Sequence, residues 1–273
     1  MPELPEVEVT RRGIEPYCLN AKVVDIWHDD KKLRVPYPEA DLSLLIGEKI
    51  NSVSRRAKYI LLNTAKGSLL MHLGMTGHLR IIQTPSDRGT HDHFELFLDN
   101  GTSIRFNDIR RFGLVSFIRK DQSLEDNRFL KDLGIEPLSD GFNSSYLYDR
   151  LQRSKKNIKQ TLLDGKIVVG VGNIYASESL FASGISPFRE SKSITKDECA
   201  ILVKQIKIIL EESIKQGGTT IRDFSGANGQ LGYIVQNLLV YGHEGEPCRK
   251  CGTKILAAVQ GQRRTFYCPN CQK

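Results

Sequence analysis

The sequence CRKCGTKILAAVQGQRRTFYCPNC, residues 248–271, contains two CxxC pairs with sixteen residues between them. Each pair presents two thiolates from one tight turn, and two such turns complete the tetrahedral shell that zinc prefers. Cysteine fills all four positions, so no coordination site is left for water or substrate. We therefore expect one structural Zn²⁺ in a C-terminal zinc finger, bound by Cys248, Cys251, Cys268 and Cys271.

Apolar residues lie between the two cysteine pairs on either side of Gly261, which predicts a β-hairpin held by the metal. Gln262, Arg263 and Arg264 lie near the tip of this hairpin. Arginine guanidinium groups on a rigid hairpin are well suited to bidentate contacts with phosphate. The alternative interpretation is a basic tip that is only solvated.

The composition is that of a globular protein: 273 residues, 40% hydrophobic and 26% charged. This length allows one large domain or two smaller ones. No apolar run reaches the roughly 18–20 residues of a membrane span, and the acidic start MPELPEVEV is not typical of a signal segment. We therefore expect a cytoplasmic protein without a membrane partner. Its net charge of +7 fits either a polyanion-binding protein or a mildly basic soluble one.

The hydrophobic pattern changes twice along the chain. Residues 5–14 can form a short helix, and runs rich in β-branched and aromatic residues then fill residues 20–120, with a hairpin signal, DNG, at 99–101. This pattern predicts a two-layer β-sandwich with an N-terminal helix. A connector over 121–140 leads to helical periodicity over 142–225. The predicted fold is therefore α+β and multidomain, with boundaries at 1–125, 126–225 and 240–273.

Two loop segments carry side chains that can wedge into a base stack. Met75 lies in the glycine-flanked turn of HLGMTGHLR, and Arg110, Arg111 and Phe112 lie in NDIRRFG, residues 107–113. Side chains of this kind fill the gap that an everted base leaves in a duplex. Taken alone, each segment is more often explained by packing in the core.

Two further segments carry groups suited to binding an anion such as phosphate. VVGVGNIYASE, residues 168–178, leads through two glycines into a helix, and backbone N–H groups at a helix N-terminus can bind a phosphate. Lys58 follows Arg55 and Arg56 in SRRAKYI, before an apolar strand. The alternatives are an ordinary helix start and a solvated basic strand end.

The chain begins MPELPEVEVTRRG, with Pro2 and Pro5 restricting the backbone around Glu3. If Met1 is removed, Pro2 presents a secondary amine with a pKa near ~8, against about 10.4 for lysine. This amine is then the chain's readiest amine nucleophile at neutral pH. The neighbouring carboxylate of Glu3 can transfer protons.

PELPEVE, RRAKY, HLGMTG, HDH, RRFG, VVGVGNIYASE and the terminal CxxC pairs occur together and in order. Over nearly its whole length, the chain resembles the bacterial formamidopyrimidine-DNA glycosylase family. The resemblance implies a bifunctional DNA glycosylase and AP lyase of base excision repair. Its expected substrates are 8-oxoguanine and formamidopyrimidines in damaged double-stranded DNA. It also implies a helix–two-turn–helix domain, a Schiff base followed by β,δ-elimination, a monomer, and no nucleotide cofactor.

The resemblance also assigns roles to individual residues. Pro2 attacks C1′, Glu3 is the general acid/base, Lys58 assists β-elimination, and Arg263 binds phosphate and supports δ-elimination. The remaining matched positions are expected to contact DNA: Met75, His91, Arg110, Phe112, Arg153 and Asn173.

The sequence departs from the family pattern at several positions. Gln160 stands where relatives commonly have proline. Ser154 stands where some relatives have lysine, directly beside the expected DNA contact Arg153. Arg264 doubles the hairpin arginine, so either arginine can be the phosphate ligand. The loop near 225–233, which caps the lesion in the family, leaves the preference among oxidised purines open.

Two other functions remain possible at the level of sequence. One is an endonuclease VIII-like glycosylase for oxidised pyrimidines, although that branch typically begins PEGPE rather than PELPE. The other is a zinc-finger DNA-binding protein that has lost catalysis. The intact Pro2, Glu3 and Lys58 argue against the latter.

Overall fold

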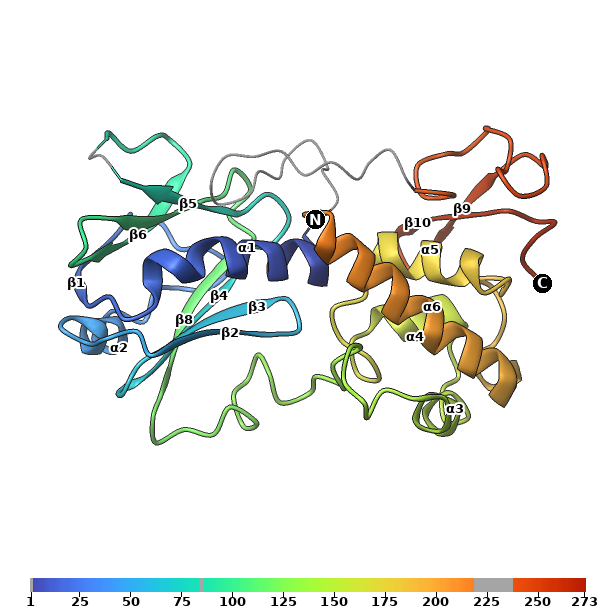
Figure 1. Ribbon diagram of the computed structural model, residues 1–273, viewed down its shortest axis with the longest axis horizontal. Helices are drawn as coiled ribbons and strands as arrows, with labels where there is room; N and C mark the ends of the chain where they lie inside the picture. The colour runs from blue at the N-terminus through green and yellow to red at the C-terminus, as the bar shows by residue number, and fades with distance from the viewer. Residues whose placement is uncertain (1, 84–85, 219–237) are drawn as a thin grey trace. The chain divides into compact units, whose positions relative to one another are not determined.

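The computed structural model describes residues 2–83, 86–218 and 238–273, and the chain divides into two compact units (Figure 1). Of the described residues, 2–83, 86–131 and 216–218 belong to the first unit, and 132–215 and 238–273 belong to the second. The expected lesion-capping loop at 225–233 lies outside the described residues.

The first unit is a sandwich of two antiparallel four-stranded sheets. One sheet has the strand order β1-β6-β7-β5, formed by Val23–His28, Asp92–Leu98, Ser103–Asn107 and His78–Ile82. The other has the order β2-β3-β4-β8, formed by Ser52–Arg56, Tyr59–Asn63, Gly67–His72 and Leu114–Arg119. A short helix, α2 (Glu39–Leu42), and a 3₁₀ turn, η1 (Ser43–Leu45), follow β1.

Helix α1 (Leu4–Cys18) packs against this sandwich and contacts strands of both sheets. Val7 and Ile14 on its buried face join one continuous core with residues of the two sheets, among them Ile60, Met71 and Phe94. The structure therefore confirms the predicted β-sandwich with an N-terminal helix. The helix is longer than the 5–14 expected from sequence and tolerates Pro16 in its last turn.

Strand β2 lacks the β-branched and aromatic pattern expected of a strand, because Val53 is the only apolar and the only buried residue of SVSRR. It is nevertheless a regular partner of β3, with Arg56 opposite Tyr59 and Ser52 opposite Asn63. An edge strand of this kind lacks the apolar alternation on which sequence reasoning depends. Its position matters, because it leads into the turn that carries Lys58.

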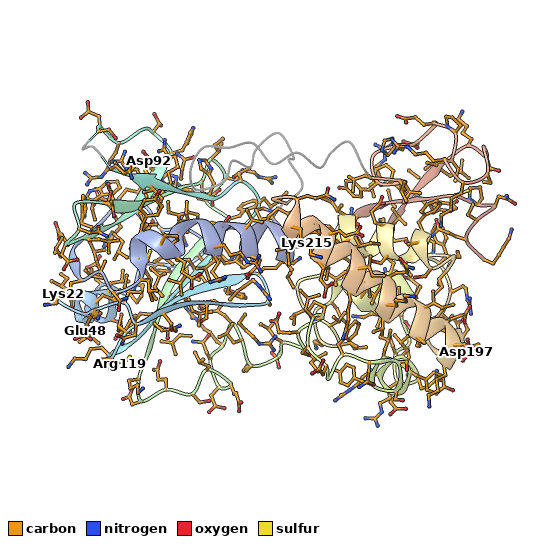
Figure 2. The ribbon with its side chains drawn as sticks, in the orientation of Figure 1. Lys22, Glu48, Asp92, Arg119, Asp197 and Lys215 are labelled. Atoms are coloured by element: carbon orange, nitrogen blue, oxygen red, sulfur yellow. The ribbon has the colours of Figure 1, made fainter. Side chains whose placement is uncertain are left out.

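The second unit consists of helices and a C-terminal hairpin. Its elements are α3 (Ser144–Leu151), α4 (Ile158–Leu163), α5 (Asn173–Ala182), η2 (Ser191–Ser193), α6 (Lys196–Lys215), β9 (Leu256–Gln260) and β10 (Arg263–Tyr267). Helix α6 packs against α3 and α5. Asp197 and Lys215 mark its two ends in Figure 2, an arrangement of charges that complements the helix dipole.

A buried carboxylate links helix α5 to the C-terminal segment that contains β9 and β10, residues 238–273, which we call the hairpin module. Glu178 accepts hydrogen bonds from the backbone N–H groups of Leu239, Val240 and Tyr241 at 2.9, 3.0 and 2.8 Å. Burial raises the pKa of Glu178, although these three donors act in the opposite direction. Val240 then joins Phe181, Ile255, Cys248 and Cys268 in a small separate core. The hairpin is thus attached to the helices through both polar and apolar contacts.

In the described part of the chain, no helix is long and apolar enough to cross a membrane.

Candidate functional site

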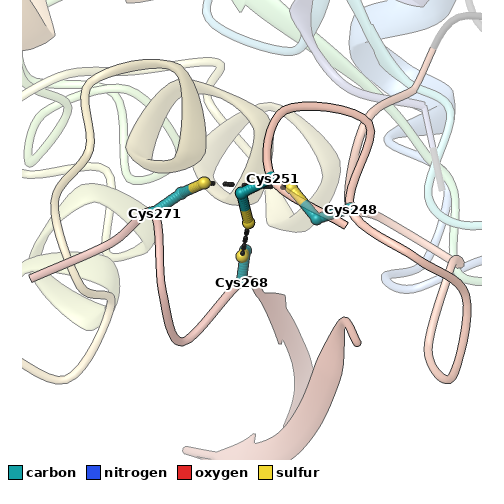
Figure 3. Close-up of side chains that lie close together, drawn as sticks. All are labelled: Cys248, Cys251, Cys268 and Cys271. Atoms are coloured by element: carbon teal, nitrogen blue, oxygen red, sulfur yellow. Dashed lines mark hydrogen bonds between the residues drawn. The ribbon is translucent and has the colours of Figure 1, made fainter. Parts of the chain in front are cut away.

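The four paired cysteines converge in the second unit, with their sulfur atoms facing one another (Figure 3). All four Sγ atoms lie within 4.8 Å of one another, with 3.9 Å between Cys248 and Cys271 and 3.5 Å between Cys251 and Cys268. A tetrahedral zinc site with Zn–S bonds of about 2.3 Å places its sulfur atoms ~3.8 Å apart. The residues therefore fit a structural zinc ion.

Helices α4 and α5 hold the hairpin beside this cluster. Buried Lys159 donates from Nζ to Thr265 Oγ1 at 2.8 Å and to the carbonyl of Arg264 at 3.4 Å. Asn173, the first residue of α5, donates from Nδ2 to the same carbonyl at 2.9 Å. Its Oδ1 atom is buried without a hydrogen-bond partner in the described structure. Asn173, which we expect to bind a phosphate, is thus hydrogen-bonded directly to the hairpin.

The two hairpin arginines differ in their surroundings. Both are exposed at the start of β10, but Arg264 forms an ion pair with Glu244. Arg263 has no ion pair within the part of the chain that the structure describes. Arg153, also exposed, follows the end of α3. The structure therefore distinguishes two arginines that sequence could not separate.

In the first unit, the start of the chain is anchored rather than frayed. Pro2 and Glu3 are buried, and Glu3 is the N-cap of α1. Glu3 and Glu6 form a capping box, in which the backbone N–H of Glu3 donates to Glu6 Oε2 at 2.8 Å. Pro5 occupies the first turn, where a missing N–H has no cost. The acidic, proline-rich start thus fixes the backbone at Pro2.

Lys58 is half-buried at the turn between β2 and β3. Tyr59, the next residue, pairs with His72 on β4, and their rings lie 4.8 Å apart. Burial lowers the pKa of His72 to about 3, and the positive charges of Arg34 and Lys58 act in the same direction. His72 is therefore neutral at physiological pH, and its Nδ1 accepts the N–H of Gly74 at 2.9 Å.

The two predicted wedge segments lie together. The backbone N–H of Arg110 donates to Thr76 Oγ1 at 3.1 Å, and a Cβ atom at Gly74 would lie 2.5 Å from the backbone of Phe112. Phe112 is 44% exposed, and the Arg110 guanidinium lies 4.5 Å from its ring centroid. Met75 in the adjoining turn is half-buried. The exposed Phe112 ring excludes simple core packing for this residue.

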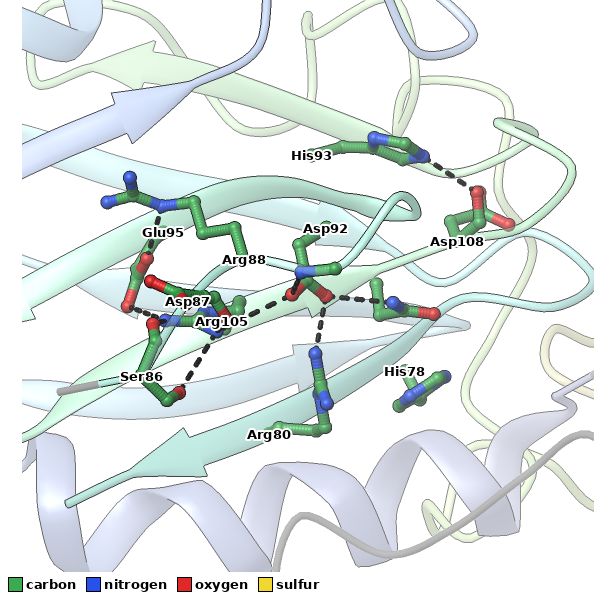
Figure 4. Close-up of polar contacts among 12 residues, drawn as sticks. His78, Arg80, Ser86, Asp87, Arg88, Asp92, His93, Glu95, Arg105 and Asp108 are labelled. Atoms are coloured by element: carbon green, nitrogen blue, oxygen red, sulfur yellow. Dashed lines mark hydrogen bonds and ion pairs between the residues drawn. The ribbon is translucent and has the colours of Figure 1, made fainter. Parts of the chain in front are cut away.

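His91 is exposed and directly precedes Asp92. Asp92 belongs to a buried polar network that sequence reasoning missed (Figure 4). Asp92 accepts hydrogen bonds from Arg80 (2.5 Å), Asn107 (2.8 Å) and the N–H of Gly89 (2.8 Å). Burial raises the pKa of Asp92, but these donors outweigh it and the net pKa is lowered. The network fixes the backbone on both sides of His91.

A second ion pair extends this network. Arg105 on β7 donates to Glu95 on β6 at 3.0 Å, and the two residues face each other across the strands. A single acidic residue in HFELF and a single arginine in SIRFN, each flanked on both sides by apolar residues, are a sequence signal for this buried pair. The wedge loop joins the same region, since the N–H of Asp108 donates to the carbonyl of His91 at 2.9 Å.

The structure thus groups the expected site residues into two sets, one in each unit. The first unit contains Pro2, Glu3, Lys58, Met75, His91, Arg110 and Phe112. The second contains Arg153, Asn173, Arg263 and the four cysteines. A β-sandwich with an exposed Arg110–Phe112 pair, combined with helices and a basic Cys₄ hairpin, indicates a zinc-finger protein that binds nucleic acid.

The chain belongs to the formamidopyrimidine-DNA glycosylase family. Three family models match it: the formamidopyrimidine-DNA glycosylase N-terminal domain at residues 1–115, the H2TH domain of the same enzymes at 133–225, and the zinc finger found in FPG and IleRS at 245–273. The predicted family, the fold class and the single structural zinc site are therefore confirmed.

Similar proteins match along the entire chain. Formamidopyrimidine-DNA glycosylases of Cronobacter sakazakii and Escherichia coli O7:K1 are each 49% identical over 273 residues, with full coverage of both sequences. The crystal structure of the MutM (Fpg) protein from Thermus thermophilus has a TM-score of 0.89 at 36% identity, covering 99% of this chain and 98% of that one. Lactococcus lactis Fpg in complex with DNA containing an abasic site gives 0.88 at 33%, with 99% of each chain covered.

Proposed function

We propose that this protein is a bifunctional DNA glycosylase and AP lyase that excises oxidised purines from double-stranded DNA in base excision repair. The observation that carries the proposal is the buried Pro2–Glu3 start of α1, fixed by a capping box, in a chain that matches the family along its whole length. A terminus without a function is usually frayed and needs no such anchor. A nucleophile does need one, because its attack requires a defined geometry.

The proposed first step uses the secondary amine that Pro2 presents once Met1 is removed. Its lone pair attacks C1′ of the damaged nucleoside, the glycosidic bond breaks, and the base leaves with that bond's electron pair and takes up the proton that the amine loses. Glu3 donates a proton to the ring oxygen of the sugar as the ring opens, which leaves a Schiff base between Pro2 and C1′. The fixed backbone at Glu3 supports this assignment.

The following eliminations break the DNA strand. Loss of a C2′ proton from the Schiff base expels the 3′ phosphate, and a second elimination expels the 5′ phosphate. We assign Lys58 to the first step and Arg263 to the phosphate beside the lesion. Arg264 is the weaker candidate for this contact because Glu244 already neutralises it.

Eversion of the damaged base costs a few kcal/mol of lost stacking and pairing. We propose that Met75, Arg110 and Phe112 fill the space that the base leaves, because their loops are joined and the Phe112 ring is exposed. Phosphate contacts through His91, Arg153 and Asn173 would offset the remaining cost. The zinc ion, when bound, stabilises the hairpin that presents Arg263 and takes no part in the chemistry.

We further propose that the protein works as a monomer in the bacterial cytoplasm and that its domains span 1–125, 126–225 and 240–273. The helical match to 225 and the zinc-finger match from 245 support this division, whereas contacts group the described helices and the hairpin into one unit.

A lesion panel tests the proposal. Duplexes containing 8-oxoguanine, a formamidopyrimidine, an oxidised pyrimidine or no lesion are incubated with the protein, and strand cleavage is measured. We expect cleavage of the two oxidised-purine duplexes, with both phosphates left on the DNA ends. Glu3→Gln should still bind the 8-oxoguanine duplex but not excise the base. Preferential cleavage at the pyrimidine lesion would contradict the substrate assignment, and the undamaged duplex is the control.

A further inference from the structure

The turn that presents Lys58 has an unusual backbone. Ala57, between β2 and Lys58, is buried and has φ of +54°, in the left-handed region that residues with a Cβ atom rarely adopt. Such conformations persist only where surrounding contacts hold them, and they concentrate at functional sites. The contacts that hold this turn therefore bear on how Lys58 is presented.

One of those contacts comes from Arg55, on the strand that leads into the turn. Its Nη1 donates to the carbonyl oxygen of Ala57 at 2.8 Å, while its Nε donates to Glu8 Oε2 at 3.2 Å. The side chains of Arg55 and Glu8 are each only 12% exposed, so solvent screens this ion pair weakly. A single guanidinium group thus bridges the strained turn and helix α1.

Glu8 is itself held in place on α1. Its carboxylate also accepts hydrogen bonds from Arg11 (3.0 Å) and Arg12 (2.7 Å), and Arg11 donates to the carbonyl of Val53 on β2 at 3.0 Å. Burial raises the pKa of Glu8, but the hydrogen bonds from Arg11 and Arg12 and the charge of Arg55 prevail and lower it. Glu8 is therefore ionised at neutral pH.

These contacts join the two chemical groups of the first unit. Helix α1 begins directly after Pro2 and Glu3, and Glu8 lies just over one turn further along it. From Glu8, the contacts continue through Arg55 to Ala57, the residue next to Lys58. The network therefore links the backbone that bears the proposed nucleophile to the backbone that bears the proposed elimination residue.

We propose that Arg55 is a positioning residue that acts through Lys58, and that Glu8 sets the orientation of its guanidinium group. The inference rests on the proposed role of Lys58. A guanidinium group can serve two acceptors at fixed angles, which the ammonium group of lysine cannot do with the same geometry. Because a displacement of about 1 Å can cost up to ~100-fold in rate, loosening this turn should slow the step that uses Lys58.

The test is a double-mutant cycle on a duplex with a preformed abasic site, which removes base excision from the measurement. Single-turnover strand cleavage is compared for wild type, Arg55→Ala, Lys58→Ala and the double variant. We expect Arg55→Ala to slow cleavage roughly 10-fold or more, but by less than about twofold when Lys58 is already alanine. Arg55→Lys should also be slow, because it keeps the charge but loses the two-way hydrogen bonding.

The chain offers a matched control and a milder variant. Arg12 donates to the same Glu8 carboxylate from a side chain that is 58% exposed, and the described structure gives it no bond to the turn. Arg12→Ala should therefore cleave at nearly the wild-type rate. Glu8→Gln keeps the side-chain volume and one hydrogen-bond acceptor. It therefore tests the contact between Glu8 and Arg55 even if Arg55→Ala fails to fold. It should slow cleavage less than Arg55→Ala, and again only when Lys58 is present.

If the fold-reductions in cleavage rate caused by Arg55→Ala and Lys58→Ala multiply in the double variant, the inference is overturned, because Arg55 then acts independently of Lys58. A wild-type rate for both Arg55→Ala and Glu8→Gln would overturn it as well. A wild-type rate for Lys58→Ala would instead refute the proposed role of Lys58, and the positioning role with it. Borohydride trapping on Pro2 reports the proposed nucleophile separately from all of these results.

Discussion

Thr76 and Asp108 are joined by a 2.5 Å hydrogen bond, from Thr76 Oγ1 to Asp108 Oδ1, that ties the turn carrying Met75 to the loop carrying Phe112. The other carboxylate oxygen of Asp108 accepts the N–H of Gly113 at 2.7 Å. Arg34 holds the same loop from another side, donating to the carbonyl of Phe112 at 3.0 and 2.7 Å. The two wedge segments are therefore presented as one rigid pair.

This arrangement predicts that Met75→Ala and Phe112→Ala impair base eversion more than binding to the unflipped duplex. A side chain that fills the vacated stack stabilises only the flipped state, so its loss should slow eversion by about tenfold while duplex affinity changes by less than about threefold. A fluorescent base analogue beside the lesion reports eversion in stopped-flow measurements. Wild-type eversion rates in both variants would show that these residues only pack the loops.

The zinc site predicts a coupled loss of metal, stability and DNA binding. Cys268 is fully buried in the core of the hairpin module, so Cys268→Ser should release zinc, lower the melting temperature and abolish binding to lesion duplex. Cys199→Ser, which alters a buried cysteine of α6 away from the cluster, is the control for loss of a buried thiol. A metal-free Cys268→Ser protein with wild-type affinity would contradict a role for zinc in binding.

The difference between the two hairpin arginines predicts different salt dependences. Each phosphate contact contributes about −0.9 to the slope of log affinity against log salt on duplex DNA. Arg263→Ala should therefore reduce the magnitude of the slope by about one contact, whereas Arg264→Ala, whose partner is Glu244, should leave it nearly unchanged. Titrations from low to physiological salt measure both. The reverse result would assign the phosphate to Arg264.

The half-buried imidazole of His72 predicts a stability change at mildly acidic pH. Its pKa of about 3 in the folded state lies well below the ordinary value near ~6.5, so below pH ~6.5 the unfolded state binds more protons and the free energy of unfolding decreases as the pH falls. Between pH 7 and 5 this one group should remove about 2 kcal/mol.

His72→Asn keeps an acceptor for the N–H of Gly74 but does not titrate, so it should lose less stability than wild type over this interval. Urea unfolding at pH 7 and 5 measures the difference between the two proteins. Equal losses in both proteins would mean that His72 is protonated in the folded state.

Local patterns in the sequence predicted the zinc cluster, the hairpin and most strands, because each depends on residues close together in the chain. The CxxC spacing alone defines the ligand set, and DNG forms the turn between β6 and β7, with Gly101 at φ of +79°. The polar strand β2 lacked any such pattern.

Long-range relations could not be obtained in this way. Thr76 and Asp108 are 32 residues apart, and Arg264 and Glu244 are 20 apart. The left-handed backbone of Ala57 is equally invisible in the sequence, because alanine rarely adopts it without tertiary contacts. The sequence supplied the expected site residues, whereas the structure gave the contacts that hold them.

The most direct test of the account is to locate the covalent bond between protein and DNA. Borohydride is added during the reaction with an 8-oxoguanine duplex, because it reduces an imine between protein and DNA to a stable cross-link. The cross-linked residue is then located by peptide mass spectrometry. We predict that Met1 is absent and that the cross-link lies on the N-terminal amine of Pro2. A cross-link on Lys58 or any other lysine would contradict it, and the capping box of Glu3 and Glu6 would then serve only to anchor helix α1.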